Sequence, residues 1–201
     1  HLVIRRQRQM CIRDRSGAFP FTPATNLMYG LKEAIDMLHE EGTGAWEAAL
    51  VNLLAEGDLV LMVETGHFAS LWHKMASNLG LKTEFLETDW RRGVDPQAVE
   101  DRLRADKDGK IKAVCVVHNE TSTGSTSRID DVRAALNASG HDALLMVDTI
   151  SSLASIDYRH DEWGVDVTVS GSQKGLMLPP GLSFNALSER AIHESLSLIH
   201  I

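Results

Sequence analysis

Four apolar runs in this chain each end in residues that could take part in catalysis. In chain order, these residues are Phe68, Asn119 and Thr121, Asp148, and Gln173 and Lys174. A lysine placed next to buried sequence can act as an amine nucleophile, because burial disfavours the charged ammonium form. Lys174 therefore suits Schiff-base chemistry with a carbonyl compound.

One carbonyl cofactor would use all of these residue types. Pyridoxal 5'-phosphate binds a lysine covalently, and its ring acts as an electron sink when a carboxylate keeps the ring nitrogen protonated. Lys174 and Asp148 are the candidates for these two roles. The phosphate group needs glycine-rich backbone amides at a helix N-terminus, and Gly42-Thr43-Gly44 stands directly before an apolar helical pattern.

Each of these residues also fits an ordinary structural role. A lysine after a strand is usually a solvated side chain, and an aspartate such as Asp148 is usually a cap or a turn former. Phe68 could stack on the cofactor ring, but a phenylalanine in this setting more often packs in a core. The joint arrangement at four strand ends favours a functional site, although it does not name the cofactor by itself.

Other kinds of site lack their sequence patterns. The spacing between Gly171 and Lys174 does not match a phosphate-binding P-loop. The nine histidines form no HExxH pattern, and two cysteines, Cys11 and Cys115, cannot build a zinc site. No G-x-S-x-G nucleophile motif is present either.

Strand-like and helix-like patterns alternate from residue 44 onwards. Strands are expected at 59–63, 83–87, 111–117, 143–148 and 165–170, and helices at 45–54, 66–80, 96–105 and 130–139. Continuous aliphatic strands are typical of a parallel sheet that is buried on both faces. The alternation therefore predicts an α/β three-layer sandwich with a mostly parallel central sheet. In such sheets the functional groups cluster at the carboxyl ends of the strands.

Composition and charge limit the partners of the chain. Its 201 residues are 43% hydrophobic and 24% charged, which is typical of one globular domain. The net charge is −8; residues 1–15 hold five arginines and one aspartate, a net +4, which leaves −12 on residues 16–201. The strongly negative charge of residues 16–201 argues against a nucleic-acid partner. No apolar run is long enough to cross a membrane, and the few cysteines fit a reducing cytoplasm.

The two ends of the sequence do not follow the central pattern. Residues 1–15, HLVIRRQRQMCIRDR, lack the continuous apolar core of a secretory signal. Their MCIRDR run and the final SLSLIHI resemble translated sequencing-adapter sequence. We therefore expect residues 1–15 and 195–201 to be non-native tails and exclude them from the fold prediction.

The run SGSQKGLMLPPG (170–181) resembles the class V pyridoxal-phosphate aminotransferases of fold type I, and most closely the serine–glyoxylate and alanine–glyoxylate aminotransferases. The similarity extends over GTGAWEAALVNLL (42–54), VETGHFASLWHKMA (63–76), HNETSTG (118–124) and LMVDTISSL (145–153). The resemblance implies that Lys174 forms the Schiff base and that Asp148 pairs with the pyridine nitrogen. It also implies that Phe68 stacks on the ring, and that Thr121, with Asn119 nearby, contacts the ring face and its hydroxyl.

The phosphate-binding positions of the family match Gly42, Thr43 and Gln173. Here the chain departs from the family, because Glu41 stands where a small residue is usual and a carboxylate beside a phosphate is unfavourable. Residues 19–42 also resemble this family, but they match a segment that normally follows the lysine. A threonine of that segment reaches the phosphate of the neighbouring subunit, and Thr22 would match it.

These matches imply a rearranged chain. Residues 16–42 would be a displaced segment, and residues 43–194 would form part of the cofactor-binding large domain. The small domain, which normally supplies the arginine for the substrate carboxylate, would be missing.

As a family member, the chain would catalyse transamination. A small amino acid such as serine or alanine would donate nitrogen, and the 2-oxo acid glyoxylate would accept it to give glycine. Lys174 would move the α-proton as general base and acid, and the intact enzyme would be a homodimer. Two alternatives stay open: an inactive fragment that keeps a relic of the cofactor site, and another class V activity. A cysteine desulfurase is disfavoured because Cys115 lies in a strand, and a lyase remains possible.

Overall fold

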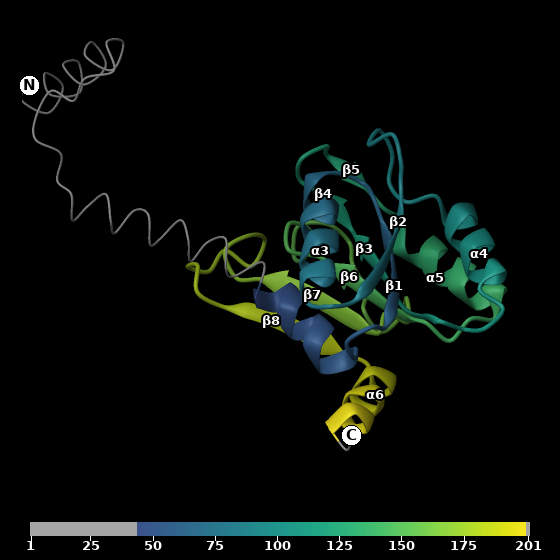
Figure 1. Cartoon of the computed structure of the whole chain (residues 1–201). Coiled ribbons are helices and arrows are strands. Elements are labelled where there is room, and N and C mark those ends of the chain that lie inside the picture. Colours follow the sequence, from purple (N-terminus) through teal and green to yellow (C-terminus); the bar gives the residue numbers. More distant parts are fainter. Residues whose placement is uncertain (1–43, 200–201) are drawn as a thin grey trace, which may run out of the picture. The chain divides into compact units, whose positions relative to one another are not determined.

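The computed structural model describes residues 44–199, with side chains up to residue 196. A six-stranded sheet in the order β2-β1-β3-β6-β7-β8 runs through this part of the chain (Figure 1). Its strands are β1 (Leu59–Val63), β2 (Lys82–Leu86), β3 (Ile111–Val117), β6 (Leu144–Asp148), β7 (Val167–Gly171) and β8 (Ser183–Leu187). All neighbouring strands are parallel except β7 and β8, which are antiparallel.

Helices follow most of the strands. They are a helix over residues 44–53, α3 (His67–Asn78), α4 (Pro96–Ala105), α5 (Ile129–Ser139) and α6 (Glu189–Ile199). A small hairpin of β4 (Asn119–Glu120) and β5 (Ser125–Thr126) stands between β3 and α5. Among these described helices, none is long and apolar enough to span a membrane.

The sheet is buried between two helical layers. Successive side chains of a strand point to opposite faces, so β1 sends Val60 and Met62 into one core and Leu61 and Val63 into the other. The first core also holds the helix 44–53 and α3, and the second holds α4 and α5. Figure 1 shows α4 and α5 together on the side of the sheet away from α3. The predicted three-layer α/β sandwich with a mostly parallel sheet is confirmed.

Local signals explain where two of the helices begin and end. The Asp95 side chain accepts the Gln97 N–H at 3.0 Å, and Pro96 occupies the first turn, so α4 begins where the sequence predicts. Gly80 has a φ of 84°, which directs the chain out of α3. The Gly80 N–H then binds the Ser77 carbonyl and the Leu81 N–H binds the Ala76 carbonyl, each at 3.1 Å. This pair of bonds is a Schellman motif, as expected for a glycine at this place.

The structure adds elements that the sequence pattern did not predict. β8 has the sequence SFNAL, and all five of its residues are exposed, so it lacks the aliphatic run that marks the central strands. The β4–β5 hairpin is too short to produce a periodic signal. α6 runs to Ile199 and so includes part of the 195–201 segment, whose non-native origin stays a prediction.

Several predicted features lie outside the described residues. They are the tail 1–15, the displaced segment 16–42, and the phosphate-site candidates Thr22, Gly42 and Thr43. Their assignments stay predictions.

Candidate functional site

Strand register brings three of the predicted strand ends together. Val117 at the end of β3 lies beside Asp148 at the end of β6, and Asp148 lies beside Val169 in β7. The segments that follow these strands therefore all leave the sheet at its carboxyl edge. The chain order also reverses here, because β1 is flanked by β2 on one side and β3 on the other. The crevice outside such a reversal is a usual ligand site in open α/β sheets.

Asp148 is a buried carboxylate that, within residues 44–199, is bound by uncharged N–H groups alone. Its side chain accepts the Ile150 backbone N–H on Oδ1 at 2.7 Å and the Trp46 indole N–H on Oδ2 at 2.8 Å. Burial raises the pKa of Asp148 to about 6, although both hydrogen bonds lower it, and the negative charge of Glu120 raises it further. Asp148 is therefore ionised at neutral pH but titrates unusually close to it.

Lys174 lies in a loop that is anchored by a buried serine. The Ser172 hydroxyl donates to the Pro179 carbonyl at 2.7 Å, and the Ser172 backbone N–H donates to the Leu182 carbonyl at 3.0 Å. Ser172 is fully buried, whereas Lys174 two residues later is exposed. The sequence argument expected burial around this lysine. The strand end is indeed buried, but the Lys174 side chain itself faces solvent.

Gly175 brings the Lys174 loop against the turn that follows Asp148. A Cβ atom at Gly175 would overlap the Leu153 carbonyl oxygen and the Ser155 hydroxyl. A Cβ at Gly171 would come within 2.9 Å of the Gln173 Oε1 atom. Only a residue without a side chain at position 175 allows this approach, so the lysine loop packs directly on the turn of the carboxylate.

Glu120 fixes the start of α3, where Phe68 lies. The Glu120 side chain is fully buried, and its carboxylate accepts the Phe68 N–H at 3.3 Å and the Ala69 N–H at 3.1 Å. Gly66, the N-cap residue of α3, supplies no side-chain cap, so Glu120 serves as the cap from β4. Phe68 is half-buried, and its ring meets the His67 ring edge-on at a centroid distance of 5.7 Å.

Asn119 joins the β4–β5 hairpin to the turn after β6. Its amide nitrogen donates to the Ser151 hydroxyl at 3.0 Å, and its amide oxygen accepts the Thr126 hydroxyl at 3.0 Å. The Ser151 hydroxyl in turn donates to the Asn119 carbonyl at 2.7 Å. Thr121 is exposed at the tip of the same hairpin. Asn119 thus holds the hairpin that carries Thr121 close to the segment that carries Asp148.

Comparison with known families agrees with this geometry. The family model for class-V aminotransferases matches residues 38–197. The chain belongs to the class-V aminotransferase family. The buried aspartate at the end of β6, Asp148, and the lysine after β7, Lys174, lie inside the matched region.

This class-V chain is also similar to individual curated proteins and solved structures. It is 49% identical over 174 residues to a serine–glyoxylate aminotransferase of Methylorubrum extorquens, covering 86% of this chain and 43% of the relative. It is 50% identical over 151 residues to an L-aspartate–glyoxylate aminotransferase of Paracoccus denitrificans, covering 75% and 38%. An alanine–glyoxylate aminotransferase structure from Nostoc matches with a TM-score of 0.71 and 32% identity, covering 78% and 40%. The chain spans less than half the length of each of these proteins.

The described residues fit the cofactor that class-V aminotransferases imply. An exposed amine, Lys174, and a buried carboxylate, Asp148, lie at the same edge of the sheet, and these are the two groups that a pyridinium carbonyl compound needs. Two buried polar atoms at this edge, Gln173 Oε1 and Thr65 Oγ1, have no hydrogen-bond partner among the described residues. Unpaired buried polar atoms are costly, so these two have hydrogen-bonding capacity that a polar ligand could use.

Sequence reasoning missed the residues that support this class-V site. Trp46, Glu120 and Ser151 hold Asp148, Phe68 and Asn119 in place, yet none of them was predicted to do so. The available signal was the polar atom of each: a buried indole N–H or carboxylate needs a partner. The identity of the partner depends on tertiary contacts that span up to 102 positions of sequence.

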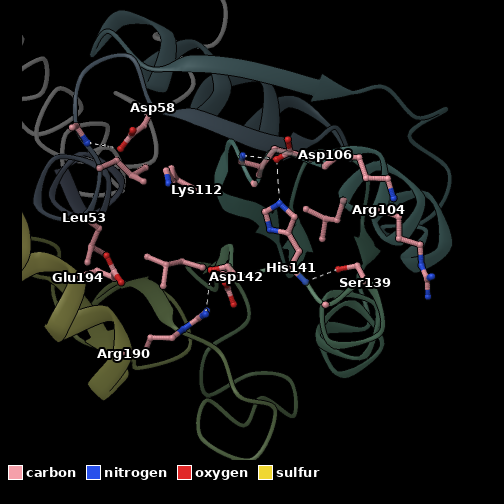
Figure 2. Close-up of a pocket in the computed structure, with 18 residues that line it drawn as sticks. Leu53, Asp58, Arg104, Asp106, Lys112, Ser139, His141, Asp142, Arg190 and Glu194 are labelled. Atoms are coloured by element: carbon pink, nitrogen blue, oxygen red, sulfur yellow. Dashed lines mark hydrogen bonds and ion pairs between the residues drawn. The ribbon is translucent and has the colours of Figure 1, made fainter.

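The amino edge of the sheet carries a cavity of about 780 Å³ with a different character (Figure 2). Its lining includes Ile111 and Leu144, the first residues of β3 and β6. Figure 2 shows Asp106 and His141 facing each other there, and their Oδ2 and Nε2 atoms are 3.1 Å apart. His141 Nδ1 accepts the Ala143 N–H at 3.1 Å, so the proton of the neutral ring lies on Nε2 and is donated to Asp106. This pair links loops of the scaffold.

Proposed function

We propose that this chain is the cofactor-binding part of a pyridoxal-phosphate-dependent aminotransferase that transfers an amino group to glyoxylate. The observation that carries the proposal is Asp148, a buried carboxylate without a cationic partner among the described residues, beside the loop of an exposed lysine. The names of the relatives support glyoxylate as the acceptor. They leave serine, aspartate and alanine as candidate donors.

The residues of the chain would share the work as follows. When bound, pyridoxal phosphate supplies an electron sink that makes the α-proton of an amino acid removable. Asp148 would accept the N–H of the ring nitrogen and hold its positive charge. Lys174 would hold the cofactor covalently and, once released, would move the α-proton as base and then acid. Its exposure leaves the amine free to reach both cofactor and substrate.

The remaining candidates would position the cofactor. Phe68, fixed by Glu120, would cover one face of the ring, and Thr121 on the hairpin held by Asn119 would contact the ring hydroxyl. The Gln173 amide would bind the phosphate together with the backbone at Gly42 and Thr43. Thr22 would reach the phosphate of a second subunit in a homodimer.

A second candidate is cofactor binding without turnover. It is favoured by the assignments themselves, because the described candidates all serve the cofactor and none of them is assigned to the substrate carboxylate. The two candidates share the cofactor site and differ in whether this chain also completes the substrate site.

Covalent labelling tests the cofactor site. The full chain is mixed with pyridoxal phosphate, reduced with borohydride and digested, and the peptides are weighed by mass spectrometry. We expect the label on the peptide that contains Lys174 and its loss in Lys174→Ala. Lys112→Ala is the matched control, because Lys112 is an exposed lysine at the amino-edge cavity. Label that is absent, or that spreads equally over Lys174 and Lys112, would contradict the proposal.

Turnover tests the reaction. The protein with bound cofactor is supplied with glyoxylate and one donor at a time: serine, aspartate or alanine. Formation of glycine with one donor supports the aminotransferase, and the fastest donor identifies the substrate. Specific labelling of Lys174 without glycine from any donor would instead support binding without turnover.

A further inference from the structure

We infer that Trp46 is a positioning residue, whose indole N–H fixes the Asp148 carboxylate in the orientation in which it meets the cofactor ring. The inference rests on the proposed function for the identity of the ring. The contact between Trp46 and Asp148 is independent of that function.

The contact between the two side chains is buried and direct. The Trp46 indole N–H donates to Asp148 Oδ2 at 2.8 Å, while the Ile150 backbone N–H donates to Oδ1 at 2.7 Å. Trp46 is 3% exposed and Asp148 is 4% exposed, so water cannot replace either bond easily. A carboxylate offers about four lone-pair sites, so two N–H groups orient it and still leave acceptor capacity for a ring N–H.

Trp46 also stands at a particular place in the fold. It lies in the first turn of the described part of the helix 44–53, directly after the predicted phosphate-binding run 42–44. This helix packs on the sheet through Trp46, Ala49 and Leu50, so the packing of the helix sets the position of the indole N–H.

Trp72 supplies a comparison within the same core. The two indole rings are stacked, with centroids 5.8 Å apart and an interplanar angle of 14°, and Trp72 is 1% exposed. The Trp72 indole nitrogen, however, has no hydrogen-bond partner among the described residues. Both tryptophans fill the core, but only Trp46 gives its N–H to a carboxylate. A role confined to packing would be shared by both.

Electrostatics gives the contact a chemical consequence. Burial raises the pKa of Asp148 to about 6, and the Trp46 bond opposes that rise. Two neighbouring residues also have titratable side chains. The negative charge of Glu120, in β4, raises the pKa of Asp148. His118 donates its backbone N–H to the Asp148 carbonyl at 2.9 Å, and burial lowers the pKa of its side chain, which is therefore neutral. Without the indole N–H, burial would raise the pKa of Asp148 further, which favours the protonated acid over the carboxylate that accepts the ring N–H.

The first test compares Trp46→Phe with Trp72→Phe in the full chain without cofactor. Asp148 is titrated by NMR of ¹³C-labelled aspartate carboxyl groups, with Asp148→Asn to assign the signal. We expect Trp46→Phe to raise the Asp148 midpoint by about one to two pH units, as loss of a hydrogen bond to a charged group implies. Trp72→Phe should leave it unchanged. An equal shift in both variants, or no shift in Trp46→Phe, overturns the inference.

A second measurement needs no tryptophan variant, in case Trp46→Phe does not fold. In the wild-type protein, the indole N–H signal of Trp46 should move with the Asp148 titration near pH 6, and the signal of Trp72 should not. Asp148→Asn should abolish the movement. A Trp46 signal that stays still through the Asp148 titration overturns the inference.

Cofactor affinity connects the inference to the proposed function. Trp46→Phe should weaken the binding of pyridoxal phosphate by about tenfold or more, and Trp72→Phe should match the wild type. Equal affinities in the two variants would overturn the cofactor role of Trp46. If the wild-type chain binds no pyridoxal phosphate, the proposed function fails and the cofactor role fails with it. The two titrations would still decide whether Trp46 orients Asp148.

Discussion

At the amino edge of the sheet, Asp166 is bound by the guanidinium groups of Arg133 and Arg190, each at 2.6 Å. At the carboxyl edge, the donors that Asp148 and Glu120 receive from the described residues are N–H and O–H groups without charge. The pKa values follow this difference. Although burial opposes it, hydrogen bonds from Arg190 and Leu145 and the charges of Arg133 and Arg190 hold the pKa of Asp166 below its ordinary value. Burial prevails at Asp148 and raises its pKa.

This difference in binding partners distinguishes a structural carboxylate, Asp166, from the candidate site carboxylate, Asp148. A carboxylate that is neutralised by arginines stabilises the loops around it and has little capacity left for a ligand. A carboxylate held by neutral donors keeps its charge available for a cation that arrives later. Such a group costs stability in the free protein, which is a common property of functional residues.

The largest expected effect tests the amino edge. Asp166→Asn should lower the free energy of unfolding by about 3 kcal/mol, because it leaves Arg133 and Arg190 without their partner. Urea denaturation at neutral pH measures this loss. A loss below about 1 kcal/mol would mean that these ion pairs do not hold the scaffold together.

The next effect concerns pH at the carboxyl edge. The pKa of Asp148 rises from 3.8 to about 6 on folding, so the folded state binds its proton more tightly. This contribution favours the folded state at low pH and is lost as pH rises through about 6. It amounts to about 3 kcal/mol at most.

Urea denaturation of wild type and Asp148→Asn between pH 4 and 7.5 isolates this contribution. The difference between the two proteins should shift in favour of the variant as pH rises. The comparison is needed because His118 works in the opposite direction: burial lowers its pKa, so its contribution is lost as pH falls from 6.5. Parallel curves for the two proteins would contradict the raised pKa of Asp148.

A smaller effect is expected at Glu120. Glu120→Gln keeps the shape but leaves an uncharged amide at the N-terminus of α3, so stability should fall by about 1–2 kcal/mol. Hydrogen exchange should show faster opening of the Phe68 and Ala69 amides, which Glu120 binds. Unchanged protection of these two amides would show that Glu120 does not cap the helix.

The smallest effect is expected at an exposed cap at the start of α4. Asp95→Ala removes the bond to the Gln97 N–H and should cost about 1 kcal/mol in thermal denaturation. A cost as large as that of Glu120→Gln would mean that burial adds nothing to a carboxylate cap in this protein.

The sequence predicted the parts of the fold that depend on local pattern. Aliphatic runs located β1 and β3 at their observed bounds, and Asp95-Pro96 located the start of α4, because these signals lie within a few residues. β8 was missed, since an exposed strand has no apolar run to mark it.

In the candidate site, too, local features could be predicted from the sequence and tertiary contacts could not. The positions of Asp148 and Lys174 after their strands could be predicted, because strand ends share one edge of a parallel sheet. The partners of Asp148 could not: Trp46 lies 102 residues away, and only the packing of the helix 44–53 on the sheet brings it there. The exposure of Lys174 was also not predictable, because it depends on how Ser172 closes the following loop.

The reactivity of Cys115 reports how often the core of the sheet opens. It lies in β3, is 2% exposed, and burial raises the pKa of its thiol far above the ordinary value, so it should react with thiol reagents only when the sheet comes apart. With Cys11→Ser as the background, its labelling rate would measure how often β3 becomes accessible. If pyridoxal phosphate joins the strands at the carboxyl edge, the rate should fall when the cofactor is added. The labelling rate of Cys115, in the middle of the sheet, would then report cofactor binding at the carboxyl edge.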